Sequence, residues 1–228
     1  MTLLDYPGKV ACTVFLQGCN FRCPFCHNSD LLNTAGQGTI TTEELLAFLK
    51  KRQGLLDGVC ITGGEPTLQK DLKDLLRSIK ELGYSIKLDT NGYRPEILKE
   101  LAADGLVDYV AMDIKNCPDR YGETAGLPGI NLDRIEESIR FLLSGKINFE
   151  FRTTIVEEFH NESTMEEIGL WLQKLDPVHK AQNFFLQAYV DRESVLRPGL
   201  HTPEGEKMRR FQRVLEPFAE KVEIRGVD

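Results

Sequence analysis

The sequence predicts an α/β protein with parallel strands, built either as an open, partial (β/α)6 barrel or as a doubly wound sheet. Strand-like and helix-like stretches alternate along the 228 residues in six units. Such alternation is typical of parallel sheets with helical crossovers. Six units are too few for a closed eightfold barrel. No linker, repeat or low-complexity segment interrupts them, so we expect a single domain spanning residues 1–228.

The predicted strands are short stretches that are apolar or alternate between apolar and polar residues. In the first of them, Cys12, Val14 and Leu16 share one face. A further stretch, 221–226, is compatible with a terminal strand. The six strands of the repeating units are expected at 9–16, 58–62, 84–89, 107–114, 148–156 and 183–190.

The predicted helices carry recognisable start and stop signals. The first has Thr41 or Thr42 as its cap, with Glu43 and Glu44 in the first turn. Gly83, Gly105 and Gly145 end three others, Pro95 lies near one start, and Ser163 or Thr164 begins another. The six helices are expected at 41–53, 68–82, 94–105, 132–145, 164–175 and 203–218.

Composition excludes several classes of function. The chain is 41% hydrophobic with a formal net charge of −7, which suits a globular core and disfavours direct binding of nucleic acid. The N-terminus lacks the features of a signal peptide, and no apolar run is long enough to span a membrane. We therefore expect a cytoplasmic protein, in which clustered cysteines act as metal ligands or catalysts rather than as disulfides.

Unusual residues fall where four consecutive strands end. Three cysteines follow the first strand, Gly63–Pro66 follows the second, Asp89–Gly92 closes the third and Met112–Lys115 closes the fourth. In open parallel sheets and barrels, chemistry is located at the carboxyl ends of the strands. This coincidence predicts one site at that end of the sheet.

Cys19, Cys23 and Cys26 have the spacing C-x3-C-x2-C. A structural zinc site needs four ligands, and the only nearby candidate, His27, adjoins Cys26 and would be strained. Ferredoxin-type clusters use four cysteines. Plain buried thiols do not fit a polar loop that contains proline and asparagine. We interpret the three thiolates as ligands of an iron–sulfur cluster that leaves one iron open for a small molecule.

The stretch GCNFRCPFCHN, residues 18–28, resembles the CxxxCxxC signature of the radical S-adenosylmethionine (radical SAM) enzymes. The resemblance implies a partial barrel of the radical SAM type and a [4Fe–4S] cluster on Cys19, Cys23 and Cys26. The open iron would be chelated by the amino and carboxylate groups of SAM. Phe25 matches the position that lies against the adenine. His27 would contact SAM through its backbone or only orient the loop.

Other motifs match positions that bind SAM in that family. Gly63, Gly64, Glu65 and Pro66 match the glycine-rich motif for the SAM amino group, although the same residues also suit a turn. Two carboxylates at adjacent strand ends should attract a cation or a cationic ligand. The resemblance places a monovalent cation at Asp89, Thr90, Asp113 and the backbone of Met112. The remaining SAM contacts that it implies are Asp89, Asn91, Asp113, Lys115, Arg152, Thr154 and Gln187.

Three cysteines lie outside the cluster motif. Cys12 and Cys60 fall within apolar strands and are expected to be small core residues. Cys117 follows the fourth strand end, where a hydrogen-atom donor or cluster ligand is conceivable, but a lone cysteine is usually unreactive.

Residues 3–156 resemble the anaerobic ribonucleoside-triphosphate reductase activating proteins and, more broadly, the pyruvate formate-lyase activating enzymes. This implies a protein substrate in which a glycine becomes a glycyl radical, with flavodoxin or ferredoxin as the electron donor. Two alternatives stay open. One is a radical SAM enzyme for a small molecule, similar to carboxy-deazaguanine synthase. The other is an iron–sulfur or zinc protein with a binding or electron-transfer role.

Overall fold

The computed structural model describes residues 2–32 and 38–226, which form one sheet of seven parallel strands. Each strand pairs with the next one in the sequence, from β1 at one edge to β7 at the other. A doubly wound sheet would reverse this order at a switch point. The predicted open barrel is therefore confirmed, with the terminal strand as its seventh. The strands are β1 (Ala11–Leu16), β2 (Gly58–Gly63), β3 (Ser85–Thr90), β4 (Tyr109–Asp113), β5 (Asn148–Ile155), β6 (Ala181–Ala188) and β7 (Ala219–Arg225).

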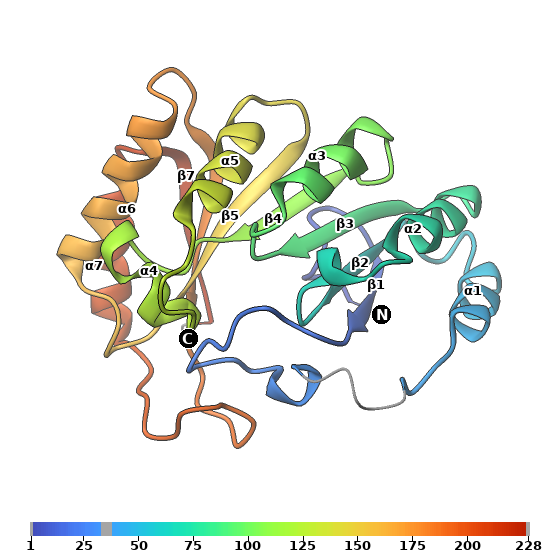
Figure 1. Ribbon diagram of the computed structural model, residues 1–228, viewed down its shortest axis with the longest axis horizontal. Helices are drawn as coiled ribbons and strands as arrows, with labels where there is room; N and C mark the ends of the chain where they lie inside the picture. The colour runs from blue at the N-terminus through green and yellow to red at the C-terminus, as the bar shows by residue number, and fades with distance from the viewer. Residues whose placement is uncertain (1, 33–37, 227–228) are drawn as a thin grey trace.

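The helices follow one another along an arc outside the strands (Figure 1). Right-handed crossovers between consecutive strands place every connecting helix on the same face. In the described part of the chain, no helix is both long and apolar enough to cross a membrane. The helices are α1 (Thr42–Lys50), α2 (Leu72–Glu81), α3 (Pro95–Ala103), α4 (Pro118–Ala125), α5 (Leu132–Leu143), α6 (Glu162–Leu175) and α7 (Gly205–Leu215), with 3-10 turns η1 (Ser29–Leu31) and η2 (Pro66–Leu68).

Helix starts agree with the sequence signals at α1 but differ at three others, one of which is α7, which begins at Gly205 rather than at residue 203. Thr41 caps α1 in a capping box with Glu44, as predicted. The predicted start of α2 at residue 68 was wrong, because Pro66–Leu68 forms the separate turn η2. The predicted start of α6 was also wrong, since Asn161 caps it and its side chain accepts from the Thr164 amide.

Helix α4 was not predicted. Pro118 occupies its first turn and Gly126 ends it with φ of 61°, the left-handed conformation that glycine adopts without strain. These two signals were present in the sequence. A segment of eight residues containing a glycine has weak helical periodicity, which is why pattern alone did not reveal it.

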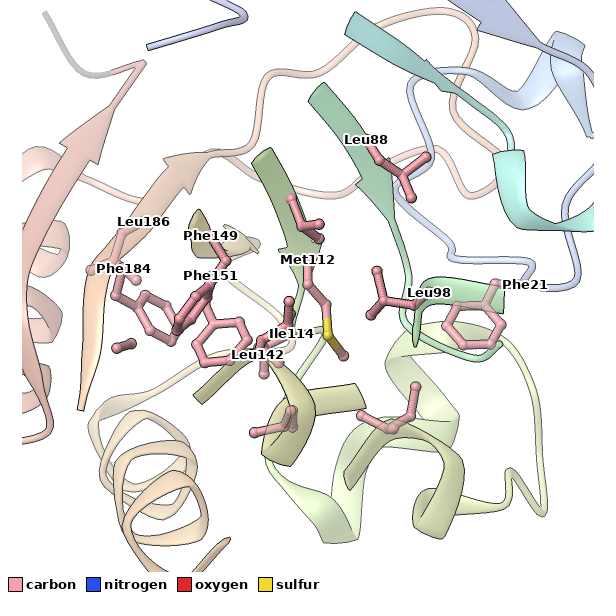
Figure 2. Packing of buried hydrophobic residues seen from close by; sticks show 14 of the residues in the cluster. Phe21, Leu88, Leu98, Met112, Ile114, Leu142, Phe149, Phe151, Phe184 and Leu186 are labelled. Atoms are coloured by element: carbon pink, nitrogen blue, oxygen red, sulfur yellow. The ribbon is translucent and has the colours of Figure 1, made fainter. Parts of the chain in front are cut away.

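The hydrophobic core lies between the sheet and the helices. Side chains from β3 to β6 point to this side and meet those of α3 and α5 (Figure 2). Cys12 belongs to this core, and Cys60 packs in a smaller cluster with Tyr6, so both predictions of buried cysteines are confirmed. The core residues labelled in Figure 2 are Phe21, Leu88, Leu98, Met112, Ile114, Leu142, Phe149, Phe151, Phe184 and Leu186.

The opposite face of the central strands is polar. Because side chains alternate along a strand, Lys87 and Asp89 of β3 point away from the core that holds Leu88. The register pairs Asp113 of β4 with Arg152 of β5. Apolar residues thus fix the strands against the helices, while charged residues face the inside of the barrel.

Candidate active site

A cavity of about 260 Å³ lies at the carboxyl ends of the strands. It joins the loop after β1 to the ends of β2 through β6, as the positions of the sequence motifs predict. Among the described residues, Glu65, Pro66 and Met112 are predicted site residues that do not line it. Those that do are Cys19, Cys23, Phe25, Cys26, His27, Gly63, Gly64, Asp89, Thr90, Asn91, Asp113, Lys115, Arg152, Thr154 and Gln187.

The loop that carries the three cysteines is held by its neighbours. The Arg22 amide donates to the Ala125 carbonyl at 2.9 Å, and the Cys23 thiol lies 3.7 Å from the same oxygen. A Cβ on Gly126 would lie 2.0 Å from the Arg22 carbonyl oxygen. The end of α4 is therefore the support on which the cysteine loop rests.

A second support comes from the chain after β6. The His27 ring stacks on Tyr189 with a centroid distance of 5.4 Å, and its Nε2 lies 2.7 Å from the Val190 carbonyl oxygen. The Ser194 hydroxyl donates to the His27 carbonyl at 2.9 Å. Both the side chain and the backbone carbonyl of His27 are thus engaged by the protein, which favours its role in orienting the loop.

Burial favours the protonated thiol of two of the three cysteines. Burial raises the pKa of Cys23 to about 12 and also raises that of Cys19. A thiolate ligand must lose its proton when it binds a metal, so cluster assembly in this loop releases protons.

The donor set fits an iron–sulfur cluster. Three thiols line one cavity, and the buried Asn20 Nδ2 has no hydrogen-bond partner among the residues that the structure describes. Inorganic and cysteinyl sulfurs of a cluster accept such hydrogen bonds. Within residues 2–32 and 38–226, no three His, Cys, Asp or Glu side chains converge on a single metal ion. The zinc alternative, which needs four ligands around one ion, gains no support from these residues.

Gly63 and Gly64 are required by the packing of the backbone. A Cβ on Gly63 would lie 2.2 Å from the Leu16 carbonyl oxygen, and one on Gly64 would lie 2.1 Å from that of Gly18. The Glu65 amide donates to the Gly18 carbonyl at 2.7 Å. These glycines let the end of β2 approach the start of the cysteine loop, and they also line the cavity.

The Glu65 carboxylate is fully buried and faces the protein. It accepts hydrogen bonds from the Asn91 amide at 2.6 Å, the Thr90 hydroxyl at 2.8 Å and the Thr67 amide at 3.1 Å. Burial raises its pKa, against the opposing effect of these donors. The structure thus shows Glu65 tying the ends of β2 and β3 together, rather than lining the cavity where an ammonium group would bind.

Arg152 lies between the two aspartates. Its Nε is 2.7 Å from Asp113 Oδ1, and its Nη1 is 3.3 Å from Asp89 Oδ2. Lys115 Nζ lies 2.8 Å from Asp113 Oδ2, and Lys87 Nζ lies 2.6 Å from Asp89 Oδ1. Burial raises the pKa of Asp113, but Arg152 and Lys115 together hold it well below its usual range. We call these five residues the charge network.

The residues expected to hold a monovalent cation do not fit one in this arrangement. Every carboxylate oxygen of Asp89 and Asp113 already faces a cationic side chain of the charge network. The Thr90 hydroxyl donates to the buried Glu65 carboxylate, and the Met112 backbone, which was the predicted contact, lies in β4 opposite Thr90 of β3. The cation that two neighbouring carboxylates were expected to attract is Arg152, with a lysine on each side.

The other predicted residues lie at the rim and wall of the cavity. Phe25 is 4% exposed, with its ring 6.1 Å from that of Phe159. Asn91 Nδ2 donates to Asn20 Oδ1 at 2.9 Å. Thr154 and Gln187 line the wall from β5 and β6. Cys117 is fully buried outside the described lining, and burial raises its pKa to about 11, so the unreactive interpretation is favoured.

Sequence reasoning missed several supporting residues. Buried His160 has Nε2 3.0 Å from the Lys115 carbonyl oxygen, while the Val156 amide donates to its Nδ1 at 3.1 Å. Lys87 completes the charge network from inside a strand. The lysine between Ile86 and Leu88 in a predicted strand was a visible signal for Lys87, whereas nothing in the sequence brings His160 near Lys115.

A partial parallel barrel with three clustered cysteines beside its strand ends is the architecture of the radical SAM enzymes. The Radical SAM superfamily model matches residues 13–172, and the chain belongs to this superfamily. A Methanocaldococcus jannaschii protein that is named as a glycyl-radical enzyme activating enzyme is 32% identical to this chain. The match covers all of this chain and 94% of the relative. The chain is 27% identical to the pyruvate formate-lyase 1-activating enzyme of Escherichia coli K12, over 96% of this chain and 93% of the relative.

Solved structures share the fold. Streptococcus suis SuiB bound to S-adenosylmethionine superposes with a TM-score of 0.72 at 14% identity, covering 98% of this chain but 51% of SuiB. A domain of pyruvate-formate lyase-activating enzyme from Bacteroides vulgatus gives a TM-score of 0.60 at 22% identity, covering 74% of this chain and 99% of that domain. This chain therefore spans about half of SuiB, and the Bacteroides vulgatus domain shares its fold over about three quarters of this chain.

Proposed function

We propose that the protein is a radical SAM activase that installs a glycyl radical in a partner protein, with an anaerobic ribonucleoside-triphosphate reductase as the partner. Cys19, Cys23 and Cys26 would hold a [4Fe–4S] cluster. When bound and reduced, the cluster supplies one electron that splits SAM into methionine and a 5′-deoxyadenosyl radical. That radical would take a Cα hydrogen from a glycine of the partner, leaving 5′-deoxyadenosine and the glycyl radical.

One observation carries the proposal. The three thiols that the protein holds in a single loop open into the same cavity as the ends of β3, β4 and β5. A ligand with one end at the cysteines therefore reaches the charge network with its other parts. SAM has an amino acid end that suits a metal and a nucleoside end that suits polar and aromatic side chains.

The chain's own residues have separable roles in this proposal. Phe25 would pack against the adenine, and Asn91, Thr154 and Gln187 would offer polar contacts along the cavity. Lys115 is cationic because Asp113 raises its pKa against the effect of burial, so it can bind a carboxylate. Arg152 would hold Asp89 and Asp113 in place while the ligand binds.

The relatives support a protein substrate. Two of them, similar over nearly their full length, are named as activating enzymes for a glycyl-radical enzyme or pyruvate formate-lyase. The choice of the reductase as the partner rests on the resemblance of residues 3–156. Flavodoxin or ferredoxin would supply the electron. A small-molecule substrate is the second candidate, because a Thermococcus kodakarensis GTP 3′,8-cyclase is 35% identical over 138 residues, which is 44% of its length.

The test is anaerobic reconstitution with iron and sulfide, followed by EPR of the reduced protein with and without SAM. Replacing Cys19, Cys23 or Cys26 with alanine should abolish both cluster assembly and SAM cleavage, whereas Cys12→Ala, in the core, should retain both. Mixing the active protein with an anaerobic reductase should give a glycyl-radical doublet. A cysteine-loop variant that still cleaves SAM fully would disprove the ligand assignment. Deoxyadenosine release that needs a small molecule and no protein would favour the second candidate.

A further inference from the structure

Lys87 is the least expected member of the charge network. It is 2% exposed and lies within β3, where a lysine must be placed among buried groups. Burying a charged amine is costly unless it is paired. Its Nζ lies 2.6 Å from Asp89 Oδ1, and this is the charged contact that accompanies its burial.

The charge network carries a net positive charge. Three basic side chains, those of Lys87, Arg152 and Lys115, face the two acidic side chains of Asp89 and Asp113. The carboxylates retain lone pairs that could face a metal ion, but a cation entering this group would be repelled by the surplus positive charge. A monovalent ion binds weakly through oxygens, so it has little binding energy with which to displace a paired ammonium group.

We propose that the Lys87 ammonium takes the place of a bound monovalent cation beside Asp89. On this proposal, SAM binding needs no alkali ion. Lys87 is a positioning residue, since it acts through Asp89 rather than on the ligand. The inference rests on the proposed function, because it takes SAM as the ligand that binds beside the charge network.

The geometry explains how one side chain can act as a tethered ion. An ammonium group and a potassium ion both carry a single charge, and both satisfy carboxylate oxygens at short range. The lysine has no entropy to lose on binding from solution, because β3 already holds it beside Asp89. Arg152 then reaches the remaining Asp89 oxygen and Asp113, so the three aspartate-facing cations fix the ends of β3, β4 and β5 relative to one another.

The decisive variant is Lys87→Met. Methionine keeps an apolar stem but is one atom shorter than lysine, so it leaves space where Nζ lay. The matched control is Lys99→Met, because Lys99 forms a surface ion pair with Glu137 at 2.6 Å. Both variants and the parent protein are studied as full-length, anaerobically reconstituted chains. Potassium chloride is exchanged for tetramethylammonium chloride at a constant ionic strength of about 0.1 M, so that screening does not change.

For the parent protein, and likewise for Lys99→Met, we expect the SAM dissociation constant to change by less than about twofold between the two salts. This change is well below the tenfold change, equal to about 1.4 kcal/mol, that would indicate a required ion. Lys87→Met should bind SAM about tenfold more weakly in tetramethylammonium and recover most of that loss in potassium. The melting temperature, measured without SAM, should rise with potassium only in Lys87→Met. Rescue by an ion distinguishes this role from a merely structural one.

Two outcomes would overturn the inference. One is a parent protein whose SAM binding falls about tenfold when alkali ions are removed. The other is a folded Lys87→Met protein that is indifferent to potassium in both measurements. Should Lys87→Met not fold, Lys87→Arg keeps the charge and must remain independent of alkali ions. The melting measurement needs no SAM, so failure of the proposed SAM chemistry would leave this result readable on its own.

Discussion

Arg152 Nε lies 2.7 Å from Asp113 Oδ1, joining β5 to β4 at the level of the cavity. The same guanidinium reaches Asp89 of β3 at 3.3 Å. One side chain thus connects three neighbouring strand ends. Its positive charge offsets the repulsion between the Asp89 and Asp113 carboxylates, which lie side by side at the opening of the barrel.

Replacing Arg152 with methionine should lower the free energy of unfolding by about 2–3 kcal/mol, because it leaves the Asp89 and Asp113 carboxylates short of a partner. The Arg152 and Asp113 side chains are 22% and 25% exposed, so the loss should lie at or below the lower end of the range for fully buried pairs. Urea unfolding of the anaerobically purified protein measures it. The double variant Arg152→Met, Asp113→Asn should be less destabilised than the sum of the single variants. Additive losses would show that the two groups are not coupled.

His160 should make stability fall in mild acid. Burial lowers its pKa from 6.5 to about 4, so the folded protein keeps it neutral while the unfolded chain takes up a proton. The contribution is present above pH 6.5, is lost as the pH falls towards 4, and amounts to about 3 kcal/mol. The difference in unfolding free energy between the parent and His160→Gln, measured across this range, isolates it. A difference that stays constant with pH would refute this assignment.

Glu65→Gln should destabilise the protein by about 2–4 kcal/mol, because every neighbour of the carboxylate is a hydrogen-bond donor. An amide must turn its own NH₂ towards either the Asn91 amide or the Thr67 and Thr90 donors. Denaturant unfolding gives the loss directly. The control Glu137→Gln, on the surface, should change stability by less than about 0.5 kcal/mol. Equal effects of the two substitutions would contradict the buried, donor-only environment.

Gly64→Ala should disrupt the cysteine loop, since its Cβ would lie 2.1 Å from the Gly18 carbonyl oxygen. We expect the free energy of unfolding to fall by more than about 3 kcal/mol. Cluster assembly, measured by absorbance, should also be lost. Gly105→Ala is the control: its Cβ would meet nothing within 4 Å, so only the strain of φ at 65° remains, about 1–2 kcal/mol. An alanine at position 64 that assembles the cluster normally would show that the loop can move away.

Several features of the fold and of the site could be predicted from the sequence because they are local. The spacing of Cys19, Cys23 and Cys26, the capping residue Thr41 and the polar residues at strand ends depend on neighbours within a few positions. The order of strands and helices follows from periodicity in the same way. Together they predicted a parallel sheet, built either as an open barrel or as a doubly wound sheet, and the strand ends that carry the cavity.

Other features needed the fold. Asp89 and Arg152 are 63 residues apart, and their contact depends on which strands are neighbours and on the register between them. The sequence could not show that Glu65 turns inward, that Arg152 reaches both aspartates, or that α4 supports the cysteine loop. The sequence alone determined the alternation of strands and helices, apart from α4, and the cysteine spacing, because each is encoded in short-range periodicity and spacing. The tertiary structure alone decided how charges on different strands are paired, because Arg152 and its two aspartates are close in space and not along the chain.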